Sequence, residues 1–336
     1  MGQVLAFRGA ATAPGFEPAA AAFIAAHTAG PGAWSAGTAK KYRETFAALA
    51  RVLPEFAADS VRALESEAGR AALAAAFEDA FGALAPATYA RHLSALRSGI
   101  TWWSRAHGWL TDDPTAGWVR PKIPVDKTRA LTRGQVEALF SMNAPLREKT
   151  LWRVTYETAA RAEEILSLDV SDLDLPNKRA AVTSKGGAKE WVHWQTGAAL
   201  LIPRLLAGRR AGPVFLSDRR PTRAVASLDL CPVTGRARLS YRRAAEIFEE
   251  STRRLAHPEA RAAELDELDG WTLHQLRHSQ LTHEAESGTN TPTLLARSRH
   301  ASVRSLERYA RPGVDAVANH VAQNDPAARR RRRPEQ

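Results

Sequence analysis

Apolar side chains recur at helical spacing through the first third of the chain. One stripe, with successive intervals of 4, 3 and 4 residues, consists of Tyr42, Phe46, Leu49 and Leu53. A second stripe of the same kind consists of Tyr89, Leu93, Leu96, Ile100 and Trp103. Because residues three and four apart share one face of a helix, both stretches are predicted to be amphipathic helices. With shorter helices predicted over 17–26 and 71–81, they indicate a compact bundle of about four helices.

This bundle is predicted to end before a proline-rich connection. Asp113-Pro114 is expected to stop its last helix. Residues 120–129 contain two prolines and four basic residues with little apolar content, which indicates a linker over 121–131. Thr132 and Gln135 then form a capping-box pattern, so a new helix is predicted to begin there.

The rest of the chain is predicted to be mainly helical with a small antiparallel β-sheet. The short strand candidates are 173–175, 180–183 and 190–194. They are separated by turn residues at Asn177-Lys178 and at 185–187. Residues 217–240 are polar and turn-rich and give no assignable element, while the acidic stretch 257–270 is expected to be a surface insertion.

The net charge of +11 and the pI of about 10.3 narrow the class of partner. A basic chain of this size usually binds polyanions, so nucleic acid is the first candidate, although a charged solubilising surface gives the same totals. Cys231 is the only cysteine, which excludes an intramolecular disulfide and a cysteine-based zinc site. No apolar run has the length of a membrane span and the N-terminus lacks the apolar core of a signal peptide, so a cytoplasmic protein is expected.

Two motifs in the middle of the chain carry charge suited to an anionic ligand. Glu164 follows Arg161 by one helical turn, a spacing at which a carboxylate can hold a guanidinium in place. Lys185 lies in a glycine-containing turn between two strand candidates, where its side chain can swing onto a ligand. Taken singly, the first motif is more typical of an ordinary surface ion pair, and the second is more typical of a solvated turn residue.

Three further motifs follow toward the C-terminus. Thr272 and Gln275 form a second capping box, which places His274 in the first turn of a helix, a position with free N–H groups and a positive dipole end. Arg277 lies three residues after His274 and is predicted to share its face. His300 and Tyr309 complete the series. Alone, these motifs are also typical of a capped helix with a surface histidine and of a half-buried packing tyrosine.

The order and spacing of these motifs resemble those of the tyrosine recombinase, or phage integrase, family, which includes Xer-type recombinases and bacteriophage integrases. The family series Arg, Lys, His-x-x-Arg, His, Tyr is matched here by Arg161, Lys185, His274, Arg277, His300 and Tyr309. The three intervals that resemble those of the family are 24 residues from the first Arg to the Lys, 23 from the second Arg to the late His, and 9 from that His to the Tyr.

The resemblance covers roughly 14–325 and is strongest over 155–190 and 271–312. It includes three departures, of which one is the acidic stretch before His274, to which no counterpart in the family is assigned. The family usually has Gly-Leu or Gly-Met before its first Arg, where this chain has Ala159-Ala160. It usually has Leu-Gly-His at the late histidine, where this chain has Ser298-Arg299-His300. An arginine in place of that glycine changes the backbone freedom beside His300.

The resemblance implies a chemistry for the two arginines and the tyrosine. Arg161 and Arg277 would clamp the nonbridging oxygens of a phosphodiester, and Glu164 would orient Arg161. Tyr309 would attack the phosphorus to give a 3′-phosphotyrosine while a 5′ hydroxyl leaves. Neither arginine is expected to belong to the protein core.

The remaining members of the series would handle protons. Lys185 is the candidate general acid for the leaving oxygen, His274 would assist proton transfer, and His300 would hydrogen-bond the phosphate. No step is expected to need a metal or another cofactor. ATP is not expected to be needed either, because the phosphotyrosine retains the energy of the broken bond.

The resemblance also implies a domain organisation and an assembly. A core-DNA-binding domain over 14–120 and a catalytic domain over 132–325, joined by the linker 121–131, would form a C-shaped clamp on double-stranded DNA. A basic disordered tail would follow over 326–336. Free monomers or dimers would assemble as a homotetramer on inverted-repeat core sites and exchange strands through a Holliday junction.

Two surfaces are expected to serve this assembly. The basic residues that are candidates for binding DNA are Lys40, Lys41, Arg43, Arg91, Arg97 and Arg105, with an ordinary solvated helix face as the alternative. An apolar stripe of Val314, Val317 and Val321 would dock on a neighbouring protomer, or else pack on its own domain. Two rival functions stay open, namely DNA relaxation by a type IB topoisomerase and DNA binding by a relative without catalysis.

Overall fold

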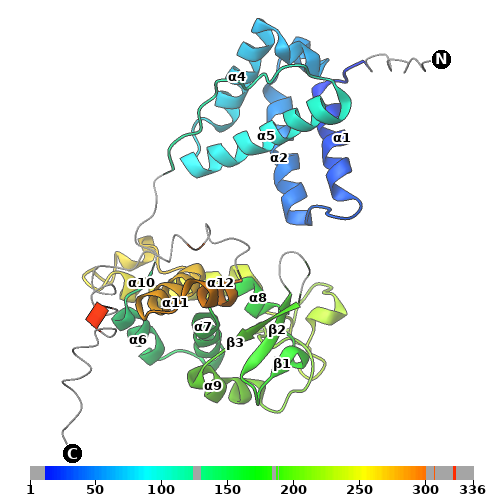
Figure 1. The fold of residues 1–336 in the computed structure, drawn as a ribbon. Helices are drawn as coiled ribbons and strands as arrows, with labels where there is room; N and C mark the ends of the chain where they lie inside the picture. Colours follow the sequence, from blue (N-terminus) through cyan, green and yellow to red (C-terminus); the bar gives the residue numbers. More distant parts are fainter. Residues whose placement is uncertain are drawn as a thin grey trace, which may run out of the picture. The chain divides into compact units, whose positions relative to one another are not determined.

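The computed structural model describes residues 12–123, 130–183, 187, 189–299, 306 and 321–322. The chain divides into two compact units, Met1–Val125 and Asp126–Gln336 (Figure 1). The division falls inside the stretch 121–131, which carries the composition of a linker. As predicted, the fold is mainly α with a small antiparallel sheet, and the sheet lies in the second unit.

The first unit is a helical bundle whose core is rich in aromatic side chains. Its helices are α1 (Phe16–Thr28), α2 (Ala36–Val52), α3 (Glu55–Ala58), α4 (Glu67–Phe81) and α5 (Pro86–His107). Both predicted apolar stripes turn inward, because Leu49 of α2 and Leu93 and Trp103 of α5 have no exposed surface. The ring of Phe23 on α1 meets Phe46 edge-on at 5.8 Å. This core joins α1, α2 and α5 into one body.

The end of α5 differs from the prediction. The helix stops at His107, before Asp113-Pro114, because Gly108 takes a left-handed φ of 63° and donates its N–H to Ser104 O at 3.0 Å. Asp113 instead organises the next turn, since its carboxylate accepts from the N–H of Thr115 at 2.8 Å. The glycine therefore ends the helix, and the aspartate caps the turn that follows it.

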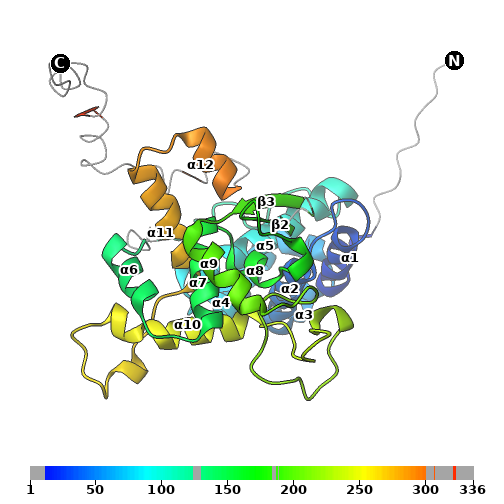
Figure 2. The ribbon, with the colours of Figure 1, turned by 90° about the horizontal axis from the view of Figure 1, so that it is seen from below.

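The second unit is built around α7. Its helices are α6 (Arg133–Ser141), α7 (Leu146–Thr158), α8 (Ala162–Leu166), α9 (Thr196–Leu206), α10 (Tyr241–Ala256), α11 (Leu273–Glu286) and α12 (Thr291–Ser298). Helix α7 packs against α8, α9 and α11, as Figures 1 and 2 show. Trp152 of α7 and Phe248 of α10 meet at 5.4 Å in the core. The capping box predicted to begin α6 is present, with Gln135 N–H donating to Thr132 Oγ1 at 3.2 Å.

The sheet has the predicted position and the order β1-β2-β3, all antiparallel. Its strands are β1 (Leu173–Asp174), β2 (Arg179–Thr183) and β3 (Lys189–His193). Ala180, Val182 and Val192 turn toward the helices and are buried, as alternation along a half-buried strand requires. Thr183 pairs with Lys189 at the far end of β2 and β3, so these two residues flank the stretch that contains Lys185.

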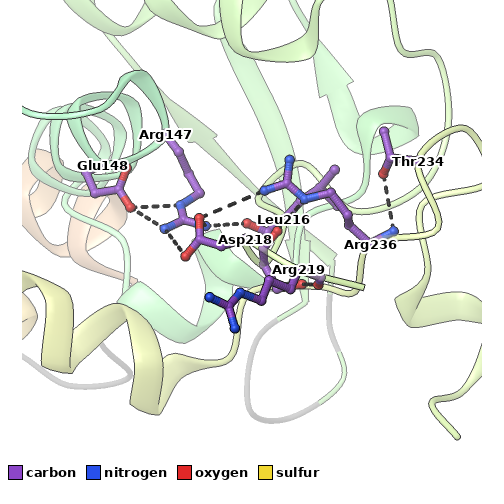
Figure 3. Close-up of polar contacts among 8 residues, drawn as sticks. Arg147, Glu148, Leu216, Asp218, Arg219, Thr234 and Arg236 are labelled. Atoms are coloured by element: carbon purple, nitrogen blue, oxygen red, sulfur yellow. Dashed lines mark hydrogen bonds and ion pairs between the residues drawn. The ribbon is translucent and has the colours of Figure 1, made fainter. Parts of the chain in front are cut away.

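Residues 217–240, which the sequence pattern left unassigned, contain a short 3-10 helix (Ser227–Asp229) and isolated β-bridges, and arginine side chains tie them to the rest of the unit. Arg147 at the start of α7 donates to Leu216 O at 2.7 Å and to Asp218 Oδ1 at 2.8 Å (Figure 3). Arg238 forms 2.8 Å ion pairs with Asp169 and Asp229. These guanidinium groups supplement short backbone pairings, in which the Ser217 N–H donates to Ala237 O at 2.7 Å and the Arg238 N–H donates to Asp229 O at 2.8 Å.

The acidic stretch 257–270 is an exposed excursion between α10 and α11, as predicted. It ends at Gly270, where a Cβ would lie 1.9 Å from the carbonyl oxygen of Glu249 on α10. The next residue, Trp271, donates its N–H to Thr252 Oγ1 at 2.8 Å. The backbone therefore packs closely against α10 immediately before α11 begins.

Candidate active site

The site is organised around a sharp turn between α7 and α8. Ala159 follows α7 with a left-handed φ of 51° and is fully buried. An L-residue with a side chain adopts this conformation at a cost of about 1–2 kcal/mol, so surrounding contacts must hold it. Arg161, two residues later, is the extended residue that caps the start of α8.

One carboxylate fixes both the backbone and the side chain of Arg161. Glu164 Oε2 accepts from the Arg161 N–H at 2.9 Å, and Oε1 accepts from Nη1 at 2.9 Å. The side chain of Glu164 is 8% exposed, whereas that of Arg161 is 42% exposed. The carboxylate predicted to orient Arg161 therefore contacts it, and the guanidinium keeps a solvent-facing surface on which an anion could bind.

Arg277 corrects the expectation that neither arginine belongs to the core. Its side chain is among the largest fully buried ones, with 1% of the residue exposed. Nη1 donates to Ala159 O and Nη2 donates to Ser298 O, each at 2.5 Å. Ala159 ends α7, and Ser298 ends α12, so Arg277 joins α11 to both helices. The side chain of Arg277 can be buried because the N–H groups of one guanidinium can donate to several carbonyl oxygens at once.

His274 and Arg277 differ in exposure although they are one turn apart. Helix α11 begins with the predicted capping box, in which Thr272 N–H donates to Gln275 Oε1 at 2.7 Å. His274 therefore lies in the first turn, where it is exposed. Its ring meets that of His278 edge-on at 4.5 Å. The predicted helix position is confirmed, and the site presents His274 to solvent while it buries Arg277.

The pattern of motifs did not identify Arg299 as a member of the site. It caps the C-terminus of α12 with a left-handed φ of 53°. Its Nη2 donates to Glu164 Oε2, and its Nε lies 3.4 Å from Glu190 Oε2 on β3. Burial lowers the pKa of this guanidinium, and the two carboxylates oppose that effect. The only signal in the sequence was the departure from the family's glycine at this position.

Helix α12 is fastened to the same region by a second arginine that the motifs did not indicate. Arg297 donates from Nη2 to Glu157 O and from Nε to Glu284 Oε1, each at 2.5 Å. Glu157 in turn accepts from the N–H groups of Gln195 and Ala198 at the start of α9, at 2.8 and 3.1 Å. Burial raises the pKa of Glu157 above its ordinary value. The last turn of α7 is therefore tied to α9, α11 and α12.

Three predicted catalytic residues, Lys185, His300 and Tyr309, lie outside the described residues. So do Val314 and Val317 of the apolar stripe, of which Val321 is described and is 62% exposed. The described part of the chain thus brings together Arg161, Arg277 and Glu164. Strand β2, which precedes Lys185, and the end of α12, which precedes His300, lie next to these three residues.

The six basic residues considered for DNA binding divide into two groups in the first unit. Lys40, Lys41, Arg43 and Arg105 are exposed. Arg97 donates to Trp118 O at 2.7 Å, and Arg91 contacts the His92 ring at 2.7 Å. Beside Arg105 lies a hollow of about 630 Å³ that is also lined by Trp34, Tyr42, Trp102 and Arg120. Arg91 and Arg97 are therefore occupied within the unit, while the other four face solvent.

Neither a metal site nor a membrane span is found in the part of the chain that the structure describes. Among these residues, no three His, Cys, Asp or Glu side chains are grouped so that they could hold a metal ion. Within the same ranges, no helix combines the length and apolar character needed to cross a membrane. The charged groups of the described site are thus arginines and carboxylates.

Comparison with known proteins agrees with this arrangement. The model of the phage integrase family matches residues 129–314. The tyrosine recombinase XerC of Bifidobacterium longum (strain DJO10A) is 25% identical over 302 residues, covering 73% of this chain and 81% of that protein. XerD of Vibrio cholerae is 34% identical over 134 residues, covering 35% of this chain and 44% of that protein.

Solved structures share the fold at low sequence identity. The Tn1549 transposon integrase in complex with transposon right end DNA gives a TM-score of 0.64 at 14% identity, covering 91% of this chain and 99% of that one. The XerH site-specific recombinase bound to its difH substrate, in a pre-cleavage complex, gives a TM-score of 0.54 at 16% identity, covering 86% and 80%.

Proposed function

Because the chain belongs to the phage integrase family, we propose that it is a site-specific DNA recombinase that cuts and rejoins strands through a covalent bond to Tyr309. One observation carries the proposal most directly. Arg161 and Arg277, the two arginines of the family series, meet at a single turn, since Arg277 bonds Ala159 O, 118 residues away in sequence. Arg161 keeps an exposed guanidinium surface, and the buried charge of Arg277 adds positive potential at the same turn, which suits a phosphodiester with its two charged nonbridging oxygens.

The reaction follows from the chemistry of that ligand. Arg161 offers a partly exposed guanidinium, held by Glu164, which stabilises the charge that grows on the phosphate as it is attacked. The Tyr309 oxygen forms a bond to phosphorus and loses its proton, with His274 assisting the transfer. The bond from phosphorus to the 5′ oxygen breaks, and its electron pair stays on that oxygen. Lys185 then supplies the proton that makes it a 5′ hydroxyl.

The second half is the same transfer in reverse. A 5′ hydroxyl from another strand attacks the phosphotyrosine, and Tyr309 leaves with a proton restored. Each step breaks one phosphate ester and makes one, so neither hydrolysis of ATP nor an oxidant is involved. His300 is assigned a hydrogen bond to the phosphate in both halves.

DNA binding is proposed for both units. The net charge of +11 and the exposed basic residues on α2 and α5 support it, and the integrase and XerH structures named above hold DNA. The first unit is proposed to bind core DNA and the second to carry the chemistry. Exchange is proposed to need a homotetramer on inverted-repeat sites, because four strands must be cut and joined in pairs.

A plasmid assay tests the proposal against its rivals. A binding site is first selected from random duplex DNA, and two copies are then placed on one supercoiled plasmid. With the two sites in direct orientation, a recombinase resolves that plasmid into two circles, whereas a type IB topoisomerase relaxes it without changing its size. A binding protein without catalysis leaves it unchanged, and either of the last two outcomes would overturn the proposal.

A further inference from the structure

Arg299 combines two features that each cost free energy. It holds a left-handed φ of 53°, a conformation that is strained for an L-residue with a side chain. Its charged side chain is only 5% exposed, so it has lost most of its hydration. A glycine would supply the same backbone conformation without either cost. The contacts of the Arg299 guanidinium must therefore stabilise this residue enough to offset both costs.

Those contacts converge on the carboxylate that holds Arg161. Glu164 Oε2 accepts from the Arg161 N–H and from Arg299 Nη2, while Oε1 accepts from Arg161 Nη1. Two guanidinium groups thus share one buried carboxylate. One of them, Arg161, is 42% exposed, and the other is enclosed. Arg161, Arg299 and Glu164 together carry a net charge of +1, whereas Glu164 and Arg161 alone would be neutral. The carboxylate of Glu190 also lies 3.4 Å from Arg299, but it is 38% exposed and is therefore screened by solvent more than the enclosed Glu164.

We propose that Arg299 is a positioning residue for DNA cleavage: it neutralises Glu164, so that this carboxylate fixes Arg161 without cancelling the charge that Arg161 offers to the phosphate. Glu190, which is 38% exposed, lies 3.4 Å from the Nε of Arg299 and links the same group to β3. The inference rests on the proposed recombinase function, because it assigns Arg299 a role in that reaction through Arg161.

Single-turnover cleavage of a nicked suicide substrate at saturating protein tests this role. Arg299→Met keeps the length of the side chain and removes its charge, and it is expected to slow covalent complex formation by about tenfold, as the loss of a supporting contact does. Arg299→Lys restores the charge and is expected to stay within about threefold of the native rate. A Met variant that cleaves at the native rate would overturn the proposal.

A double-variant cycle separates positioning from simple support of the fold. If Arg299 acts through Glu164, Arg299→Met should cost less than about twofold when Glu164→Gln is already present. A purely structural role would give the same loss in both backgrounds, which would also overturn the inference. Arg147→Met is the matched control. Arg147 is 12% exposed and also contacts two carboxylates (Figure 3). It lies at the start of α7, whereas Ala159 follows the end of that helix.

A glycine variant covers the case in which Arg299→Met does not fold. Arg299→Gly relieves the left-handed strain, so it is expected to fold and still to cleave about tenfold slower. Ala207→Gly, at the exposed left-handed residue after α9, measures the effect of relieved strain alone and is expected to cleave at the native rate. Native cleavage by Arg299→Gly would overturn this inference and leave the proposed function standing. A native protein that forms no covalent complex would overturn both.

Discussion

Replacing each of the two arginines with alanine should separate catalysis from stability. Arg277→Ala removes two charge-assisted hydrogen bonds, and it leaves the carbonyl oxygens of Ala159 and Ser298 in a region where neither residue is exposed. A hydrogen bond to a charged group contributes about 1.5–3 kcal/mol. We therefore expect the second unit to lose about 3 kcal/mol or more of its free energy of unfolding, which is roughly a 150-fold change in the opening equilibrium.

Arg161→Ala should behave differently, because that side chain is 42% exposed and Glu164 retains Arg299 as a partner. Only the Arg161 end of this ion pair is exposed, and the buried Glu164 keeps both Arg299 and the Arg161 N–H as partners, so stability should change by only about 1 kcal/mol. Both variants should slow cleavage by at least two orders of magnitude, since removing one charge donor costs about 3–4 kcal/mol in the transition state.

Hydrogen–deuterium exchange resolved by peptide measures the difference in one experiment. In Arg277→Ala, peptides from the end of α7, from α11 and from α12 should exchange faster, while peptides from the first unit serve as the internal reference. In Arg161→Ala, all of these peptides should exchange at the native rate. If Arg277→Ala leaves exchange in α7, α11 and α12 unchanged, its two carbonyl contacts do not stabilise the unit and the reasoning is wrong.

Three further predictions concern other parts of the chain. Cleavage should proceed at the native rate in excess EDTA, because arginines supply the positive charge; loss of cleavage that magnesium restores would contradict this. Deleting 327–336 should weaken binding to all duplexes alike and reduce the dependence of affinity on salt, because each phosphate that the protein neutralises contributes about 0.9 to the log–log slope; titrations at several salt concentrations measure this. Truncation after residue 312 should instead impair the formation of multi-protomer complexes in gel shifts. A full complex from that truncation would show that the valine stripe packs within its own protomer. Ala207→Gly should raise the free energy of unfolding in urea by about 1 kcal/mol, because an exposed residue with φ of 48° is strained; a decrease would contradict the assignment of strain.

Regular elements were predictable wherever local signals agreed. The stripes on α2 and α5, both capping boxes and all three strands follow from spacing and turn residues, which act over a few positions. The end of α5 was placed too late, because a single glycine in the left-handed conformation ended the helix before the more conspicuous Asp113-Pro114. Residues 217–240 were left unassigned because their backbone pairing is limited to isolated bridges, while the side chains of Arg147 and Arg238 form contacts that are distant in sequence.

The sequence indicated which residues form the site, but not how deeply each of them is buried. The order of the motifs indicated Arg161, Arg277 and Glu164, and the structure brings these three to one turn. The burial of Arg277 was not predictable, because it depends on two carbonyl oxygens that α7 and α12 present from distant parts of the chain. The same holds for Arg299, whose carboxylate partners lie on α8 and β3.

The most direct test of the proposed function is the identity of the residue that becomes joined to DNA. The protein is trapped on a nicked suicide substrate, the covalent band is isolated from a denaturing gel, and the DNA-linked peptide is identified by mass spectrometry. We predict a phosphotyrosine at Tyr309, and no covalent band from Tyr309→Phe, which retains the aromatic ring and should still bind DNA. A covalent band that persists in Tyr309→Phe, or a DNA adduct on another residue, would contradict the proposed mechanism.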